Sequence, residues 1–180
     1  MAILPIYTFG DEVLRKQASD LKSVDSNIDK LIINMFETMY QADGIGLAAP
    51  QVGQSINLLL VDISQTREGK GVAPMVIINP EILEESGSCS MEEGCLSVPN
   101  INDFVERPEY ITLKYRDDKF NERIELFSGL QARVIQHEFD HLLGTLFVDH
   151  LSPFKRSFLK NKLKDIQRGR VDVEYILAAK

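Results

Sequence analysis

Residues 135–144 read IQHEFDHLLG and contain two of the three histidines in this sequence of 180 residues. His137 and His141 stand four residues apart, so on a helix their imidazoles lie on one face and can share a metal ion. Glu138 follows the first histidine and completes the H-E-x-x-H spacing of metal-dependent hydrolases. The segment therefore predicts a helix that carries a metal site.

The same helix has a second interpretation that involves no metal. Val134, His137 and His141 fall on one side at spacings of three and four, so both rings lie on or beside an apolar stripe. Burial of an unpaired polar ring costs roughly 1–3 kcal/mol, and a shared metal ion relieves that cost. Alternatively, Glu138 and Asp140 hydrogen-bond two histidines of an ordinary core. The spacing favours the metal.

A catalytic metal site needs a third ligand and an open position. The extended zincin pattern would place a histidine where this chain has Phe147, and neither His150 nor Glu174 stands at a suitable spacing. Cys95, in the segment EEGCLSVP, is the remaining soft ligand; it is expected in a loop between strands, where a glycine allows close backbone approach. An ordinary buried thiol is the alternative for Cys95.

The expected order of elements is helices, then strands, then two helices. Helices are predicted over 11–19, 28–43, 130–143 and 153–168, with Ser26 or Asn27 capping the second and Ser152 the last. INLLLVDI and MVII predict buried strands, and EYITLKY and ERIELF alternate like an antiparallel hairpin. This predicts an α+β fold, a mostly antiparallel sheet packed around the central metal-binding helix with N-terminal helices and a C-terminal helix.

Length and composition favour one domain over residues 1–180. With 44% hydrophobic and 26% charged residues, the chain can build one well-buried core. The N-terminus, MAILPIYTFGDEVLRK, has no basic region of a signal peptide, and the longest apolar run, INLLLV, is too short to cross a bilayer. Cys89 and Cys95 are the only cysteines, which is too few for a disulfide framework but allows one bridge between them. We expect a cytoplasmic protein without membrane contacts.

Charge is distributed unevenly along the chain. The formal net charge is -7, but residues 152–180 carry eight basic and three acidic side chains, a balance of +5 that leaves -12 for the rest. A basic tail on an acidic body is either a docking surface for an anionic partner such as RNA or a solvated helix face.

Three segments together indicate a family. GIGLAAPQ at 44–51, EGCLS at 93–97 and QHEFDH at 136–141 resemble, in this order and at these separations, the three signature motifs of peptide deformylase. The resemblance extends over the intervening strands and the C-terminal helix, nearly the whole chain. It implies that Cys95, His137 and His141 bind one divalent ion, with Fe2+ native and Zn2+, Ni2+ or Co2+ as substitutes.

The resemblance also implies a reaction, hydrolysis of the formyl group from the N-terminal formyl-methionine of nascent chains. Glu138 would take the proton of the attacking water and return it to the leaving nitrogen. The family's oxyanion donors correspond to the side-chain amide of Gln51 and the backbone N–H of Leu96.

The implied substrate contacts surround these groups. Gly46 corresponds to the glycine whose backbone pairs with the peptide, and the alternative for its segment is a tight turn after a helix. The methionine pocket corresponds to Ile45, Met91, Leu130 and Val134, with the edge of His137 in its wall. Some bacterial members carry an arginine where this chain has Asn102, and the nearest arginine is Arg107, so the contacts beyond the methionine are left open.

The C-terminal helix resembles that of the bacterial and organellar members. Its basic face would suit docking on ribosomal RNA near the exit tunnel. Phe154, Phe158 and Leu163 are expected to pack on the body. Removal of the segment from Gly169 onward is expected to leave turnover of a small formyl-peptide nearly unchanged while weakening salt-sensitive binding to ribosomes.

Two rival functions can be stated. A metallopeptidase would act on an internal amide, but no further ligand stands at the spacing it would need. A non-catalytic ribosome-associated module with a structural metal would normally close the site with four protein ligands, whereas the sequence offers three.

Overall fold

The computed structural model describes residues 2–180 and has the predicted α+β architecture. Its larger sheet is antiparallel throughout, with the strand order β1-β2-β3-β6-β7. The strands are β1 (Gly46–Ala48), β2 (Leu58–Val61), β3 (Met75–Ser86), β6 (Tyr110–Arg116) and β7 (Glu122–Ser128). The expected hairpin is β6–β7, in which Leu113 pairs with Glu125.

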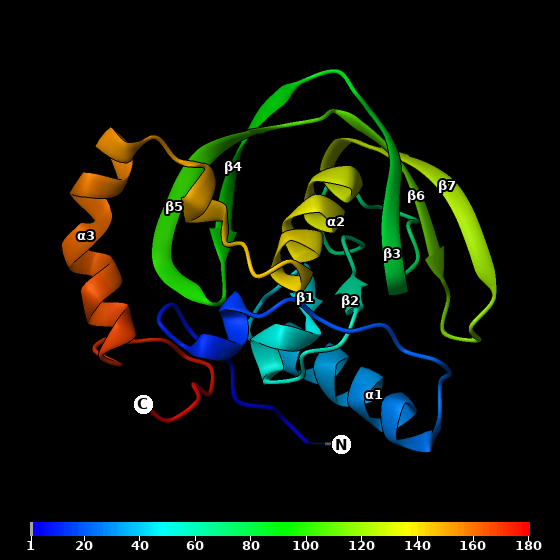
Figure 1. Ribbon diagram of the computed structural model, residues 1–180, viewed down its shortest axis with the longest axis horizontal. Coiled ribbons are helices and arrows are strands. Elements are labelled where there is room, and N and C mark those ends of the chain that lie inside the picture. The colour runs from blue at the N-terminus through cyan, green and yellow to red at the C-terminus, as the bar shows by residue number, and fades with distance from the viewer. Residues whose placement is uncertain (1) are drawn as a thin grey trace.

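A second, two-stranded sheet consists of β4 (Cys89–Cys95) and β5 (Val98–Arg107). The connections from β3 to β4 and from β5 to β6 run side by side over the top of the molecule in Figure 1 and are joined by a hydrogen bond of 3.1 Å from Glu109 N–H to the Ser86 carbonyl. The sequence did not predict this hairpin, because its strands alternate weakly. Cys95 is the last residue of β4 and not part of a loop.

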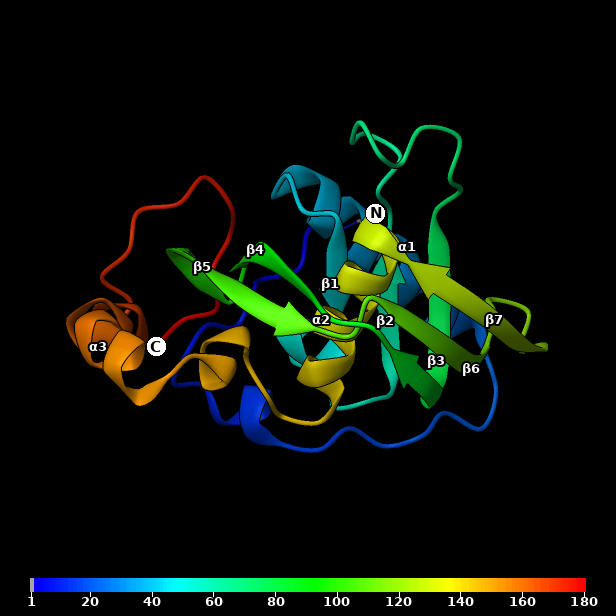
Figure 2. The same ribbon diagram turned by 90° about the horizontal axis from the view of Figure 1, so that it is seen from above.

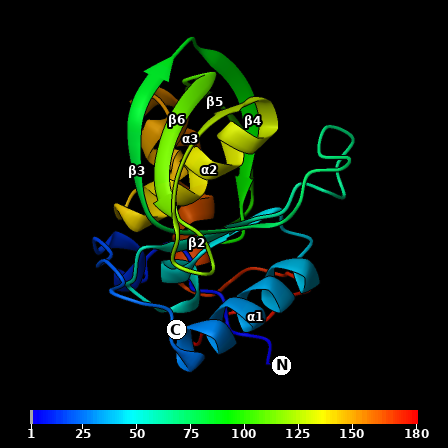
Figure 3. The same ribbon diagram turned by 90° about the vertical axis from the view of Figure 1, so that its right-hand side faces the viewer.

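Helix α2 (Gly129–Leu142) lies between the two sheets, as Figures 2 and 3 show from two further directions. Its apolar residues Val134 and Ile135 pack into a core cluster with Leu59, Ile77 and Ile111 of the larger sheet. On the other side, the helix faces β4 and β5. A buried helix between two sheets is therefore the element around which the fold is organised.

The N-terminal helices differ in part from the prediction. Only Glu12–Arg15 is helical in the first predicted helix, as a single 3-10 turn. The second is α1 (Ser26–Gln41), which packs against β1 and β2. Its N-cap is Asp25 and not Ser26 or Asn27, because the Asp25 carboxylate accepts from two backbone N–H groups of the first turn, each at 2.9 Å.

Helix α3 (Pro153–Gln167) begins as predicted, with Ser152 as N-cap and Pro153 at its first position. Leu163 and Ile166 pack into a cluster with Val98 of β5. Phe154 and Phe158 do not pack on the body as expected, since they are 72% and 70% exposed.

The physical reason is helical spacing. Phe154 and Leu163 are nine residues apart, which is a rotation of about 180° on a helix, so they occupy opposite faces. The two phenylalanine rings contact each other instead, edge to face, with centroids 4.8 Å apart. Within residues 2–180, no helix is both long and apolar enough to cross a membrane.

Candidate active site

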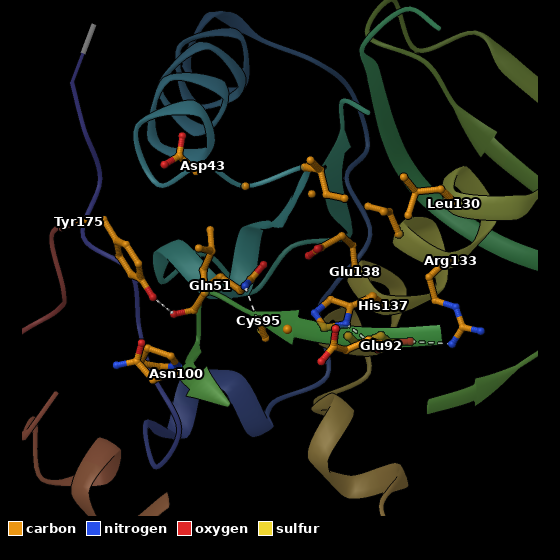
Figure 4. A pocket seen from close by; sticks show the side chains of 18 of the residues that line it. Asp43, Gln51, Glu92, Cys95, Asn100, Leu130, Arg133, His137, Glu138 and Tyr175 are labelled. Carbon is orange, nitrogen blue, oxygen red and sulfur yellow. Dashed lines mark hydrogen bonds and ion pairs between the residues drawn. The ribbon is translucent and has the colours of Figure 1, made fainter. Parts of the chain in front are cut away.

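Three side chains that can bind a metal converge between α2 and the end of β4. One ligand atom each from Cys95, His137 and His141 lies within 4.8 Å of the others, and the Sγ of Cys95 is 3.2 Å from the Nε2 of His141. Both histidines are buried, with 8% and 1% of their surface exposed. Figure 4 shows Cys95, His137, Glu138 and Gln51 gathered at the centre of one pocket.

A buried glutamate orients the first histidine. The Nδ1 of His137 lies 2.9 Å from a carboxylate oxygen of Glu93. The other ring nitrogen, Nε2, is therefore the one available to bind a metal together with Cys95. Glu93 also accepts from Arg107 at 2.6 Å and from Arg133 at 2.8 Å. Burial alone would raise the pKa of Glu93, but the hydrogen bonds from His137 and Arg107 hold it well below its usual range, so the carboxylate stays charged.

The remaining candidate ligands have other partners. His150 lies 2.7 Å from Asp140, which also pairs with Arg107 at 2.7 Å. Phe147, at the position where the extended zincin pattern would have a histidine, stacks on His137 with ring centroids 6.1 Å apart. Asp140 therefore takes no part in bonding the two metal-site histidines, contrary to the alternative considered from the sequence.

The Gln51 side chain contacts both Cys95 and the turn that follows it. The N–H of Ala48 donates to the Gln51 Oε1 at 2.8 Å, which directs the amide nitrogen toward Cys95 Sγ at 3.7 Å and Ser97 Oγ at 3.2 Å. Gln51 is 1% exposed. Leu96 and Ser97 form the two-residue turn between β4 and β5.

Glu138 is buried beside the histidines with one oxygen unused. Within the described residues its Oε2 has no hydrogen-bond partner, and burial raises its pKa to about 7. A Cβ added to Gly46 would lie 2.5 Å from Glu138 Oε1 and 2.6 Å from Val134 Cγ1. Only glycine allows β1 to approach this carboxyl so closely.

A cavity of about 410 Å³ reaches this group. Among the residues predicted from the family resemblance, its lining includes Ile45, Gly46, Leu130 and Val134. Met91, the fifth, does not line the cavity. Val173 and Tyr175 from the C-terminal segment do line it, which the sequence did not suggest.

The residues fit a bound cation. A thiol and two imidazoles are donors that suit a divalent transition metal. Burial lowers the pKa of His141 well below its usual value, so its ring is neutral as a ligand must be. Burial also opposes charge on His137, but its contacts with Cys95 and Glu93 outweigh this and raise the pKa of that ring, so the surroundings favour a positive charge at this position.

Four residues at or beside the site were not predicted from the sequence, namely Glu93, Arg107, Arg133 and Tyr175. Arg133 had a signal, because it lies one helical turn before His137 on the same buried face. Glu93 stands two residues before Cys95 and so shares its side of β4. Arg107 and Tyr175 had none, since their contacts depend on how distant segments meet.

Three side chains that can bind one metal lie beside an unpaired carboxyl, and an open cavity reaches them. This combination defines a mononuclear metallohydrolase. The family model for polypeptide deformylases matches residues 3–157. The peptide deformylase of Chlorobium phaeovibrioides is 54% identical over 176 residues, covering 98% of this chain and 93% of that protein.

Solved structures of similar fold are also peptide deformylases. The crystal structure of a peptide deformylase from Legionella pneumophila has a TM-score of 0.85 at 44% identity, covering 94% of this chain and 98% of that one. The enzyme from Ehrlichia chaffeensis in complex with actinonin also has a TM-score of 0.85, at 39% identity, covering 96% of this chain and 100% of that one. The chain belongs to the polypeptide deformylase family.

Members of this family are metal-dependent hydrolases that remove the N-formyl group from nascent polypeptides, and this is the activity of the chain. The resemblance inferred from the three motifs is thereby confirmed. Family membership also decides against the two rival functions, a metallopeptidase and a non-catalytic module with a structural metal.

Proposed function

We propose that Cys95, His137 and His141 hold the metal ion and that Fe2+ is the native one, with Zn2+, Ni2+ or Co2+ able to replace it. The thiol and the two imidazoles form the donor set, and Glu93 fixes the tautomer of His137 through its 2.9 Å contact with Nδ1. When bound, the cation supplies Lewis acidity at the formyl oxygen and lowers the pKa of the attacking water.

Glu138 moves the proton in the proposed reaction. Its Oε2 is buried and unpaired among the described residues, and this observation carries the proposal. A carboxyl with a pKa of about 7 can take a proton from the attacking water and return it to the leaving nitrogen at neutral pH. The products are formate and a peptide with a free amine.

Gln51 and Leu96 stabilise the negative charge that develops on the formyl oxygen. The Gln51 amide is held in one orientation by Ala48 N–H, so its nitrogen donors need not reorganise during the reaction. The N–H of Leu96 stands next to the thiol in the β4–β5 turn and supplies the second donor. Removal of one such donor costs roughly 3–4 kcal/mol in other enzymes.

The methionine side chain binds against Ile45, Leu130 and Val134 in the proposed complex. The substrate backbone lies along β1 at Gly46, where the missing side chain leaves the strand open to an extended peptide. Met91 is left out of the proposed pocket, because it does not line the cavity.

The test combines metal analysis with two substrates. Protein purified without oxygen should contain about one iron per chain and release formate from a formyl-methionyl peptide, while the acetylated peptide should be inert. An active anaerobic preparation that contains zinc and no iron would contradict the assignment of Fe2+ as the native ion. Equal turnover of the two peptides would contradict the proposed pocket.

We also propose that α3 docks the enzyme on ribosomal RNA. Arg156, Lys160 and Lys164 line a surface hollow beside the helix and make no ion pair within residues 2–180. Lys160→Glu together with Lys164→Glu should weaken ribosome binding and flatten its dependence on salt. Lys22→Glu with Lys70→Glu is the matched control, because it changes the net charge by the same amount away from α3. An equal loss of ribosome binding in the control would show that net charge, and not the surface of α3, determines binding.

Two further expectations from the sequence enter the proposal. Residues 1–180 act as one catalytic domain, and the protein works in the cytoplasm, where formylated chains emerge from ribosomes. A single cooperative unfolding transition and recovery of the activity in the cytoplasmic fraction are the measurements that check them.

A further inference from the structure

The segment after α3 turns back to the body and lies against the N-terminal segment around Ile6. Gly169 adopts a φ of 68° at the turn. Ile6 then donates to the Ile176 carbonyl and accepts from the Ala178 N–H, both at 2.9 Å, and Lys180 pairs with Asp11 at 2.9 Å. The tail is therefore fixed at several points, and it lies outside the residues that the family model matches.

Tyr175 extends from this tail into the cavity. Its hydroxyl donates to the Leu96 carbonyl at 2.8 Å, a bond drawn as a dashed line in Figure 4, and its side chain lines the pocket with that of Val173. Burial raises the pKa of Tyr175 to about 12, so the hydroxyl keeps the proton it donates.

The Leu96 carbonyl belongs to a turn that the sheet itself does not hold. The β4–β5 register shifts between Gly94 and Cys95, and Leu96 and Ser97 lie outside the ladder. The peptide between these two residues can rotate in a short turn unless its neighbours fix it. The Ser97 carbonyl is held by Phe9 N–H at 2.8 Å, and the Leu96 carbonyl is held by Tyr175.

We propose that Tyr175 is a positioning residue for the reaction. By fixing the carbonyl of Leu96, it fixes the backbone of the residue whose N–H is proposed to face the developing oxyanion. The segment after Gly169 then contributes to turnover, contrary to the expectation from the sequence. This inference rests on the proposed role of the Leu96 N–H. The N-terminal segment contacts the other proposed donor as well, since Tyr7 N–H donates to the Gln51 carbonyl at 2.8 Å.

Tyr175→Phe tests the proposal, because it keeps the ring in the pocket wall and removes only the hydroxyl. We expect kcat for a formyl-methionyl peptide to fall about 3- to 10-fold, as for one lost hydrogen bond, with KM within about twofold of wild type. Amide hydrogen exchange at Leu96 and Ser97, measured by NMR, should become faster with and without metal.

Tyr115→Phe is the matched control. It removes a tyrosine hydroxyl that bonds Glu125 at 3.0 Å on the β6–β7 hairpin, outside the cavity lining. We expect this variant to keep kcat and the exchange rates of the β4–β5 turn.

Three results would overturn the inference and separate its causes. Unchanged kcat with unchanged exchange would show that Tyr175 does not hold the turn, while the role of Leu96 would stand. Faster exchange with unchanged kcat would show that the Leu96 N–H contributes nothing to turnover, and the proposed role of Leu96 would fail too. A rise in KM alone would make Tyr175 only a wall of the pocket.

Discussion

Helices α2 and α3 have similar lengths, 14 and 15 residues, but opposite relations to the solvent. In α2, nine residues are buried, and five of them are polar or charged: Arg133, Gln136, His137, Glu138 and His141. In α3, only Leu163 and Ile166 are buried, and two phenylalanines are mostly exposed. One helix buries polar groups, and the other exposes apolar ones.

The difference shows where each helix departs from the usual distribution of side chains. Partners that compensate for lost hydration make buried charge tolerable, and Arg133 and His137 of α2 have such a partner in Glu93. Glu138 has one oxygen without a partner among the described residues, next to the residues that can hold a metal. The exposed rings of α3 need no compensation inside the protein, and they are free to contact another molecule. The polar face of α2 is proposed to serve catalysis, whereas the two exposed phenylalanines of α3 are not part of the core.

The largest expected effect concerns the metal on the polar side of α2. Cys95→Ala should lose the bound ion and all formate release, because two imidazoles alone hold a divalent cation poorly. Cys89→Ala is the matched control and should keep about one metal per chain, since no other metal-binding side chain converges with Cys89 among residues 2–180. Metal analysis of both proteins decides, and equal loss from both would refute the ligand assignment.

The next effect separates chemistry from burial at Glu138. Glu138→Gln keeps the shape and a hydrogen-bonding group but cannot accept a proton, so turnover should fall by about 10²–10⁴. Metal content and melting temperature should change little, and all three quantities can be measured on one preparation. Near-normal turnover per metal ion would mean that another group handles the proton.

The buried ion pairs beside α2 should matter chiefly for stability. Arg107→Met leaves the buried Glu93 without one partner and Asp140 without a cation, and we expect a loss of about 3–5 kcal/mol in the free energy of unfolding. Lys114→Met removes an exposed pair with Glu81 and should leave the free energy of unfolding nearly unchanged, because water screens this pair. Urea unfolding of the metal-loaded protein measures the free energy of unfolding of both variants. Similar losses in the two would contradict the expected difference between the buried and the exposed ion pair.

The smallest effect is expected on the exposed face of α3. Phe154→Ser with Phe158→Ser should change the free energy of unfolding by no more than about 0.5 kcal/mol per residue, because both rings already face solvent. Leu163→Ala, on the opposite and buried face, should cost about 2 kcal/mol or more. Large destabilisation by the phenylalanine changes would show that these rings pack on the body.

The sequence predicted the elements whose signals are local. The H-E-x-x-H helix was identified from spacing alone, and so were the N-cap Ser152 and the β6–β7 hairpin. The β4–β5 hairpin was missed, because its exposed faces and its bulge after Gly94 disturb the alternation that identifies strands. The error over Phe154 has the same kind of cause, since counting apolar residues does not show which face of a helix meets the body.

By itself, the sequence determined the fold class, because this depends on periodicity within short segments. Its three motifs determined the resemblance to the family, and that resemblance implied the three residues proposed to hold the metal. Only the tertiary structure decided that Glu93, Arg107 and Arg133 form one buried network and that Tyr175 reaches the turn after Cys95. Tyr175 and Leu96 are separated by 79 positions in the chain. No local sequence pattern encodes such a contact, because it depends on how two segments that are distant in the chain pack against each other.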